Sequence, residues 1–485
     1  MKKSASKISV VVPVRNASGT LADCLAAVLD QTEKPHEVIV VENDSDRETR
    51  NVIDDFRKRY PDLLKVVHEG IPGRASARNA GIARTQGDII AMTDADCIAP
   101  KNWLERITHP IREEGENAVM GFEEPELENY WTRMRQKEDA EFAYSTFDGK
   151  YANHVDTKNF AIRADLMKGT MFDPELLAYE DWDLFLRLAK KGAKIRFLPD
   201  VIVRHRHNAS FGELLKTQYA RARGMERAFV AHWNDPSFRD HYKEDASARS
   251  HRFWNFIAFI PWSVWQLITD PKKAAFRIVS DAAWKVGLVV ESISIRCARF
   301  RIAIARRLLG IQMETPEILA VFRAIRPPMN LLVFGAGNDS LFWREENRNG
   351  RTVFLEDEEA WLDRIRKQCP ALELYRVDYG TRVSDWRTLI DHPDELELKL
   401  PADIRETAWD VVLVDGPAGY APQKPGRMKS IFEASRLAKP GGSVFIHDSE
   451  REVEKEYGEK YLGKGSIVEE AVGRAVMRRY LRTLR

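Results

Sequence analysis

Cysteine is scarce in this chain of 485 residues, and neither sign of charge is in excess. The four cysteines, Cys24, Cys97, Cys297 and Cys369, show no C-x-x-C spacing, which argues against a zinc knuckle or a disulfide framework. The formal net charge of +1 argues against a globally basic nucleic-acid-binding protein, so nucleic acid is not an expected partner. These absences favour a folded protein of the reducing cytoplasm.

Long apolar runs are also missing. No stretch of about 18 or more uninterrupted apolar residues occurs, so no membrane-spanning helix is predicted. The apolar run at residues 8–14 follows Met1-Lys2-Lys3 as a signal peptide would, but its shortness and its end in a proline-containing turn favour a buried first β-strand.

What is present is an alternation of strand-like and helix-like segments, which occurs twice. In the first part we expect strands at 8–14, 37–41, 64–67 and 88–93 with helices at 21–30, 46–60 and 75–85. After Gly310 we expect strands at 330–334, 351–355, 372–377, 411–414 and 443–446. Such alternation predicts two doubly wound, Rossmann-like α/β domains, at residues 1–235 and 313–485, with ligands at the carboxyl ends of the strands.

Residues 236–312 form a predicted helical connector that is aromatic first and then basic. Its aromatic stretch at 253–268 contains three tryptophans but is interrupted by Asn255 and Pro261. Further along, apolar residues recur at helical spacing: Val286, Val290, Ile293, Phe300, Ile304 and Leu308. Two interpretations stay open, a basic amphipathic helix at the inner surface of an anionic membrane and a helical spacer that packs on its neighbours.

Two aspartates, Asp94 and Asp96, close the predicted strand at 88–93. Carboxylates at a rigid strand end are suitable ligands for a divalent metal, which neutralises a nucleoside-diphosphate leaving group. Such a pair alone is weak evidence, because solvated loop aspartates are common.

The motifs around this pair are far more specific as an ordered series. VVPVRN at 11–16, EVIVVENDS at 37–45, ARNAG at 77–81 and GDIIAMTDAD at 87–96 together resemble the family 2 inverting glycosyltransferases of GT-A fold, over about the first 230 residues. The resemblance implies a nucleotide-sugar donor, a divalent metal such as Mn²⁺ or Mg²⁺, and a glycan or lipid-linked glycan acceptor. It also implies a nucleotide pocket lined by Pro13, Arg15, Glu42 and Arg78, with Asp94 facing ribose and metal and Asp96 facing the metal. Glu42 departs from the family, which usually has Asp at that position.

The second acidic motif of that family matches YEDWDLFLR at 179–187. Inverting transfer needs one base for the acceptor hydroxyl, and we predict Asp181 in this role with Glu180 orienting the acceptor. The alternative is an acid-rich helix N-terminus favoured by the helix dipole.

Downstream of that motif, His205 is a candidate metal ligand. His207 is a less favoured candidate. The basic residues Arg221, Arg223 and Arg227 either fold over the diphosphate or form a solvated helix face, and the second interpretation is slightly favoured.

A glycine-rich turn follows the strand at 330–334, and an acid ends the next strand. Phe334, Gly335 and Gly337 would let the backbone approach a ligand, while Glu356 would accept hydrogen bonds from two ribose hydroxyls. This spacing suits dinucleotide dehydrogenases and class I methyltransferases alike. Ser340 in place of the third glycine, and LAKPGGSVF at 437–445, favour S-adenosylmethionine, with Ser340 predicted at its site.

A narrower resemblance covers about residues 313–465. NLLVFG at 330–335, GRTVFLE at 350–356, VDGP at 414–417, PGRM at 425–428 and HD at 447–448 resemble the glucuronoxylan 4-O-methyltransferase family. It implies a sugar hydroxyl as acceptor. Asp415 and Asp448 either act as base or jointly hold a second divalent metal, and their structural alternatives are a turn and a helix cap. His447 and Arg427 are secondary candidates, Arg427 as a clamp for a substrate carboxylate.

The sequence therefore predicts a bifunctional enzyme that transfers a sugar with inversion and O-methylates a sugar hydroxyl. Two alternatives stay open. In one, only the glycosyltransferase is active and the C-terminal domain binds glycan or serves targeting. In the other, the chain is a membrane-surface scaffold that works through residues 253–309.

Overall fold

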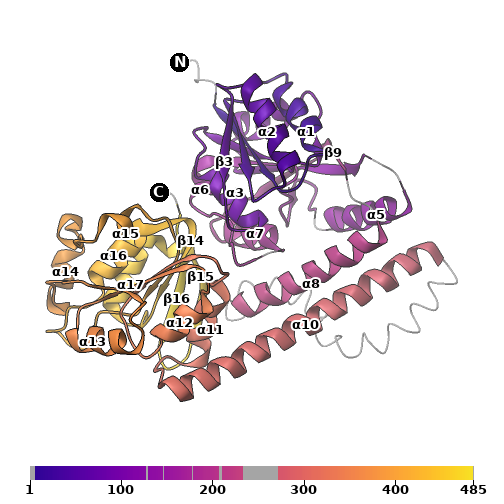
Figure 1. Ribbon diagram of the computed structural model, residues 1–485. Helices are drawn as coiled ribbons and strands as arrows, with labels where there is room; N and C mark the ends of the chain where they lie inside the picture. The colour runs from indigo at the N-terminus through magenta and orange to yellow at the C-terminus, as the bar shows by residue number, and fades with distance from the viewer. Residues whose placement is uncertain are drawn as a thin grey trace. The chain divides into compact units, whose positions relative to one another are not determined.

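The computed structural model describes residues 6–126, 129–145, 147–176, 178–206, 210–232 and 271–483. Two compact units are present, Met1–Ser292 and Ile293–Leu484 (Figure 1). Each is an α/β unit built on one sheet, so the predicted fold class is confirmed. The boundary between the units lies inside the predicted connector, and the three-part division of the chain stays a prediction. His207 and the aromatic stretch 253–268 lie outside the described residues.

The sheet of the first unit is mixed rather than wholly parallel. Its order is β3-β2-β1-β4-β8-β6-β9-β5, with β7 paired to β9. The strands are β1 (Ile8–Val14), β2 (Glu37–Glu42), β3 (Leu64–His68), β4 (Ile89–Met92), β5 (Cys97–Ile98), β6 (Ala118–Pro125), β7 (Tyr151–Ala152), β8 (Phe160–Arg163) and β9 (Ile195–His205). The four predicted strands are the parallel set β1 to β4. The short β8 runs antiparallel to both β4 and β6, a pairing that periodicity does not predict.

Two apolar cores cover the two faces of this sheet. One contains residues of α1 (Leu21–Leu29), α2 (Arg47–Arg59) and α4 (Trp103–Glu113). The other contains residues of α3 (Arg74–Ile82), α6 (Ala164–Lys168) and α7 (Glu180–Lys190). The alternation of side chains along each strand supplies both cores, because successive residues point to opposite faces. Helix α5 (Tyr130–Ser145) contacts β6.

Helix α8 (Phe211–His232) is joined to the long helix α10 (Pro271–Leu309) by two ion pairs that share one buried acid. The carboxylate of Glu291, only 3% exposed, binds Arg223 at 2.6 Å and Arg227 at 2.7 Å. The interpretation of these two arginines as a solvated helix face is therefore wrong. Both arginines are paired within the first unit by Glu291 of α10, an acid that lies far from them in the sequence.

The second unit has the strand order β12-β11-β10-β13-β14-β16-β15. Its strands are β10 (Asn330–Phe334), β11 (Arg351–Glu356), β12 (Glu373–Arg376), β13 (Trp409–Val414), β14 (Ala438–Ile446), β15 (Ile467–Val472) and β16 (Val476–Leu481). The first five are parallel and correspond to the five predicted strands, while β16 is antiparallel to β14 and to β15. The antiparallel strands β15 and β16 thus lie together at one edge of this sheet, next to β14.

The helices of this unit surround the parallel strands. They are α11 (Thr315–Ala324), α12 (Ser340–Glu346), α13 (Glu359–Gln368), α14 (Trp386–Leu389), α15 (Ala402–Glu406), α16 (Met428–Leu437) and α17 (Glu452–Gly458). Residues of α16 and α17 share one apolar core with β10, β11, β13 and β14. Helix α11 instead contacts β15 and β16, and these contacts bring Glu317 of α11 next to the strand ends.

Leu332 lies on β10 in the middle of this sheet and is fully buried. We expect Leu332→Ala to lower the free energy of unfolding by about 2–5 kcal/mol, because it removes buried methyl groups and leaves a cavity. Val472→Ala on the outer strand β15 is the matched control, since Val472 is 58% exposed and its loss should cost less than about 0.5 kcal/mol. Urea unfolding followed by tryptophan fluorescence measures both. Equal losses would contradict the placement of Leu332 in the core.

Candidate functional sites

The carboxyl ends of β1, β2 and β4 meet at one edge of the first sheet. Strand pairing sets Pro13 beside Val41 and Val11 beside Met92, so the ends carrying Pro13, Glu42 and Asp94 lie together. Arg15 is exposed just beyond β1. The edge predicted from sequence as the nucleotide pocket is therefore assembled at the topological position where such sheets bind ligands.

Arg78 of α3 connects the two acidic motifs. Its guanidinium is 2% exposed and lies 2.9 Å from a carboxylate oxygen of Asp94 and 2.9 Å from one of Glu180. Burial alone would lower the pKa of Arg78, but the charges of Asp94 and Glu180 outweigh it and raise the pKa. The arginine therefore stays cationic and fixes two acids that are far apart in the sequence.

Asp181 is the neighbouring acid at the start of α7. Burial first, and the charge of Glu180 second, raise the pKa of Asp181 to about 6. A carboxylate with this pKa is ionised at neutral pH and is a stronger proton acceptor than an ordinary aspartate. The two acids thus differ in their surroundings: Glu180 is bound to Arg78, whereas burial beside Glu180 raises the pKa of Asp181, whose role as base stays a prediction.

The residue before these acids has an unusual backbone. Tyr179 is the N-cap of α7 and adopts a left-handed conformation with φ 66°, which is unfavourable for a residue other than glycine. Its ring packs edge-on against Trp182, with centroids 6.4 Å apart, and against Trp284 of α10, with centroids 6.0 Å apart. Nothing local in the sequence links Trp284 to a motif that lies about a hundred residues earlier.

A second group of the first unit has the composition of a metal site. Among the residues that the structure describes, only Asp96, Cys97 and His205 offer three ligand atoms within 4.8 Å of one another. His205 Nε2 lies 3.2 Å from Asp96, and Nδ1 lies 2.8 Å from Glu123. Burial raises the pKa of the Cys97 thiol well above its usual range, so Cys97 is the weaker ligand of the three.

Glu123 of β6 holds the imidazole of His205 from behind, an arrangement that orients histidine ligands at metal sites. Burial alone would lower the pKa of His205, but hydrogen bonds to Asp96 and Glu123 raise it to about 9. Without a metal the ring is therefore protonated at neutral pH, and metal binding there has to release that proton. Nothing local in the sequence points to Glu123, because its partner His205 is 82 residues away.

Two predicted residues have partners that differ from the expectation. Asp94 pairs with Arg78 and stands outside the group of Asp96, Cys97 and His205, and its contact with ribose and metal stays a prediction. The buried carboxylate of Glu42 lies 2.6 Å from the ring of His68 and also accepts the N–H of Ser45. Glu42 is thus engaged within the protein at the end of β2.

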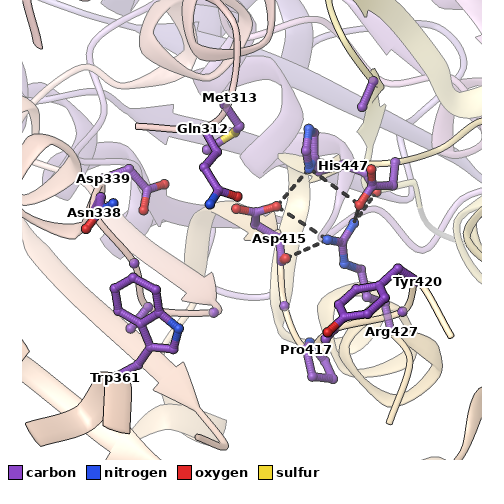
Figure 2. A pocket seen from close by; sticks show the side chains of 18 of the residues that line it. Gln312, Met313, Asn338, Asp339, Trp361, Asp415, Pro417, Tyr420, Arg427 and His447 are labelled. Atoms are coloured by element: carbon purple, nitrogen blue, oxygen red, sulfur yellow. Dashed lines mark hydrogen bonds and ion pairs between the residues drawn. The ribbon is translucent and has the colours of Figure 1, made fainter. Parts of the chain in front are cut away.

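The second unit contains a cavity of about 650 Å³ at the carboxyl ends of its parallel strands. That volume is typical of small-molecule sites. The lining includes most of the predicted residues together with new ones: Glu317, Gly335, Ala336, Gly337, Asp339, Glu356, Trp361, Asp415, Tyr420, Arg427, His447, Asp448 and Arg451. Figure 2 shows Trp361 and Asp339 on one side of it and Asp415, His447 and Arg427 on the other.

The glycine-rich turn forms part of this lining. Gly335 has φ +104°, and a Cβ there would come within 2.9 Å of the backbone nitrogen of Gly416. Gly337 is less restricted, and its backbone N–H donates to the Ser340 hydroxyl at 3.0 Å. Ser340 and Phe334 are fully buried and do not line the cavity, so their contribution is to shape the turn rather than to touch a ligand.

Glu356 ends β11 at the cavity wall. Its carboxylate accepts the backbone N–H groups of Ala336 at 2.7 Å and Glu358 at 2.8 Å. Burial is the main cause that raises the pKa of Glu356 to about 7. The acid is thereby fixed beside the glycine-rich turn, in the position predicted for hydrogen bonds to ribose hydroxyls.

Asp415 and Asp448 are connected by two cationic side chains (Figure 2). His447 Nδ1 lies 2.8 Å from Asp415 and 3.7 Å from Asp448. Arg427 lies 2.8 Å from Asp448 and 3.5 Å from Asp415, and also donates to the backbone carbonyls of Asp415 and His447. The terminal nitrogens of Arg427 are thus engaged inside the cluster, which does not favour its predicted role as a carboxylate clamp.

Glu317 completes this cluster from α11. Its carboxylate is 1% exposed, accepts the N–H of Ala475 at 2.9 Å and lies 3.5 Å from His447 Nε2. Burial alone would lower the pKa of His447, but the carboxylates of Asp415 and Glu317 raise it to about 10. The imidazole is therefore cationic at neutral pH. The only local signal for Glu317 is its capping box with Glu314, which predicts a helix start and no site.

Comparison with known proteins distinguishes the two units. Residues 9–175 match the family model of glycosyl transferase family 2, and residues 314–398 and 394–480 match that of the IRX15/IRX15L/GXM family. The chain is 31% identical over 235 residues to glycosyltransferase AglE of Haloferax volcanii, a match that covers 46% of this chain and 74% of that protein.

For the second unit, the chain is 42% identical over 177 residues to glucuronoxylan 4-O-methyltransferase 1 of Arabidopsis thaliana. This match covers 32% of the chain and 63% of that protein, so the chain spans less than two thirds of the relative's length. Among solved structures, the mannosyltransferase PcManGT from Pyrobaculum calidifontis, in complex with GDP-Man and Mn²⁺, aligns with a TM-score of 0.46 at 17% identity, over 60% of this chain and 88% of that one.

The group of Asp96 and His205 leads to a binding prediction. We expect the full chain to bind Mn²⁺ in titration calorimetry, and Asp96→Ala to weaken that binding at least tenfold by removing a hard oxygen ligand. Asp55→Ala is the matched control, because Asp55 is an exposed aspartate on α2. Binding that is equally strong in Asp96→Ala would place the metal elsewhere.

Proposed function

The chain belongs to glycosyl transferase family 2 through its N-terminal part and carries a C-terminal part of the IRX15/IRX15L/GXM family, and from this premise we propose a bifunctional enzyme of polysaccharide biosynthesis. The first unit transfers a sugar from a nucleotide-sugar to a glycan or lipid-linked glycan with inversion. The second unit methylates a sugar hydroxyl with S-adenosylmethionine. The observation that carries the proposal is that each unit gathers acids and buried cations at the carboxyl edge of its own sheet.

In the first unit, Asp181 takes the proton of the acceptor hydroxyl while that oxygen attacks the anomeric carbon in line with the leaving diphosphate. Arg78 holds Glu180 beside this base, which leaves Glu180 placed to orient the acceptor. Asp96 and His205, with Glu123 behind the ring, fit a divalent ion. Such an ion neutralises the charge that develops on the diphosphate.

In the second unit, the glycine-rich turn and Glu356 support the nucleoside part of S-adenosylmethionine, the methyl donor. Asp415 would take the proton of a sugar hydroxyl, and bound S-adenosylmethionine would supply the methyl group that this oxygen receives. The cations His447 and Arg427 lie beside Asp415 and favour a developing alkoxide electrostatically. A second metal between Asp415 and Asp448 remains the alternative, and loss of methyl transfer in EDTA would favour it.

Covalent linkage of the two units motivates a further part of the proposal. The sugar that the first unit adds, or its neighbour, is the methyl acceptor of the second unit on the same glycan. Methylation of small metabolites by the second unit, without methylation of the first unit's product, would contradict this coupling.

The base assignment predicts a pH dependence for sugar transfer. A base must be unprotonated. The rate should therefore be low at pH values well below the pKa of Asp181, which is about 6, and should increase as the pH rises through that value. Asp181→Asn should lower kcat at least about 100-fold with little change in KM for the donor. Release of nucleoside diphosphate from a panel of UDP- and GDP-sugars measures both. Asp165→Asn, at an exposed aspartate on α6, is the control, and equal rates in both variants would exclude Asp181 as base.

The methyltransferase part predicts binding of S-adenosylmethionine by the purified full chain in titration calorimetry. Gly337→Trp should abolish it, because a Cβ at Gly337 meets only the Asp339 carboxylate at 3.2 Å, so the indole can occupy the cavity without displacing backbone. Lys399→Trp adds the same side chain at an exposed position outside the cavity lining and should bind normally. No binding by the wild type would leave the glycosyltransferase as the active unit, with a C-terminal domain that binds glycan or serves targeting.

A further inference from the structure

Helix α10 carries apolar side chains on two opposite faces. In its second-unit part, Ala298 and Ile302 face inward and are buried. On the other side, apolar residues recur every three or four positions and are exposed to solvent, with Phe300 at 69% and Leu308 at 77%. This outer stripe consists of Ile293, Cys297, Phe300, Ile304 and Leu308. Contiguous exposed apolar surface of this kind is uncommon unless it binds something.

Arginines border the outer stripe. At 100° per residue, Arg296 and Arg307 fall on one edge of it and Arg301 on the other. Arg296 and Arg307 are exposed, whereas Arg301 pairs with Glu346 at 2.6 Å. The sequence contains no aspartate or glutamate from Ser292 to Gln312. The outer face therefore combines apolar side chains with the exposed positive charges of Arg296 and Arg307 on one edge, and with the Arg301–Glu346 ion pair on the other.

We propose that this outer face of α10 binds the surface of an anionic lipid bilayer. Apolar side chains of a surface helix enter the boundary between headgroups and acyl chains, while arginines at the edges of the stripe extend to lipid phosphates. No described helix has the length and apolarity to cross a bilayer. The inference goes beyond the proposed function, because it names a surface that neither reaction requires.

The charge pattern favours a lipid surface, rather than a second copy of the chain, as the binding partner of this outer face. Spacing of three and four residues also suits a helix–helix seam. Two copies of α10 would, however, bring arginines together at the seam with no acidic residue between Ser292 and Gln312 to pair with them. Like charges at such positions are unfavourable, whereas each arginine near an anionic surface strengthens binding about fivefold at low ionic strength.

Vesicle flotation of the full chain tests the proposal. We expect co-flotation with phosphatidylcholine vesicles that contain about one third phosphatidylglycerol, and at least tenfold weaker binding to pure phosphatidylcholine. High salt should weaken the binding, because it screens the arginines. No co-flotation with the anionic vesicles would overturn the proposal.

Variants identify the surface that binds. Phe300→Glu combined with Leu308→Glu should reduce co-flotation at least tenfold, and Arg296→Gln combined with Arg307→Gln should reduce it on anionic vesicles only. Val472→Glu is the matched control, since Val472 is an exposed apolar residue on β15. All three should keep the circular dichroism spectrum and thermal midpoint of the wild type.

Two results would contradict the assignment. Unchanged flotation of the Phe300→Glu/Leu308→Glu variant would place the lipid contact elsewhere. A wild-type dimer that this variant converts to a monomer, with no vesicle binding in either, would identify the stripe as a self-association surface.

Discussion

The buried guanidinium of Arg78 is the interaction on which the first site depends. It lies between Asp94, at the end of β4, and Glu180, at the start of α7. Without this cation, the buried carboxylate of Glu180 and the largely buried carboxylate of Asp94 would lose the ion pairs that compensate their burial, which is strongly unfavourable. Because Arg78 sits on α3 and its partners follow a strand and begin a helix, the ion pairs also fix the spacing of three elements. Asp181 obtains its raised pKa from the same surroundings.

In the second unit, too, acids are paired with cations, but the residues involved are different. Asp415 and Asp448 end up in one cavity, where two carboxylates would repel each other. Arg427 and His447 each place one positive charge beside these two acids. Glu317 pairs with the other nitrogen of the His447 imidazole. Both units therefore use buried cations to keep acids charged and oriented at the carboxyl edge of a parallel set of strands, although the two sites serve different group transfers.

The first-unit and second-unit parts of helix α10 have different surroundings. Within the first unit, Trp284 packs on Tyr179, and Glu291 binds two arginines of α8, so the helix supports the backbone just before Glu180 and Asp181. Within the second unit, it presents an apolar face bordered by arginines. A basic amphipathic pattern in the sequence is compatible with both packing and surface binding, and the structure shows packing contacts on one face and an exposed apolar stripe on the other.

The sequence by itself determined the two α/β folds, the parallel strands and the acids at their ends. Those features are local, since apolar periodicity and turn residues decide where a strand ends and a helix begins. Tertiary structure alone decided that Arg78 joins Asp94 to Glu180, that Glu123 orients His205, and that Glu317 reaches His447. It also decided that Ser340 and Phe334 are buried outside the cavity lining, and that Arg223 and Arg227 pair with Glu291. These outcomes depend on which elements pack together, and contacts between residues distant in the chain leave no periodicity in either segment.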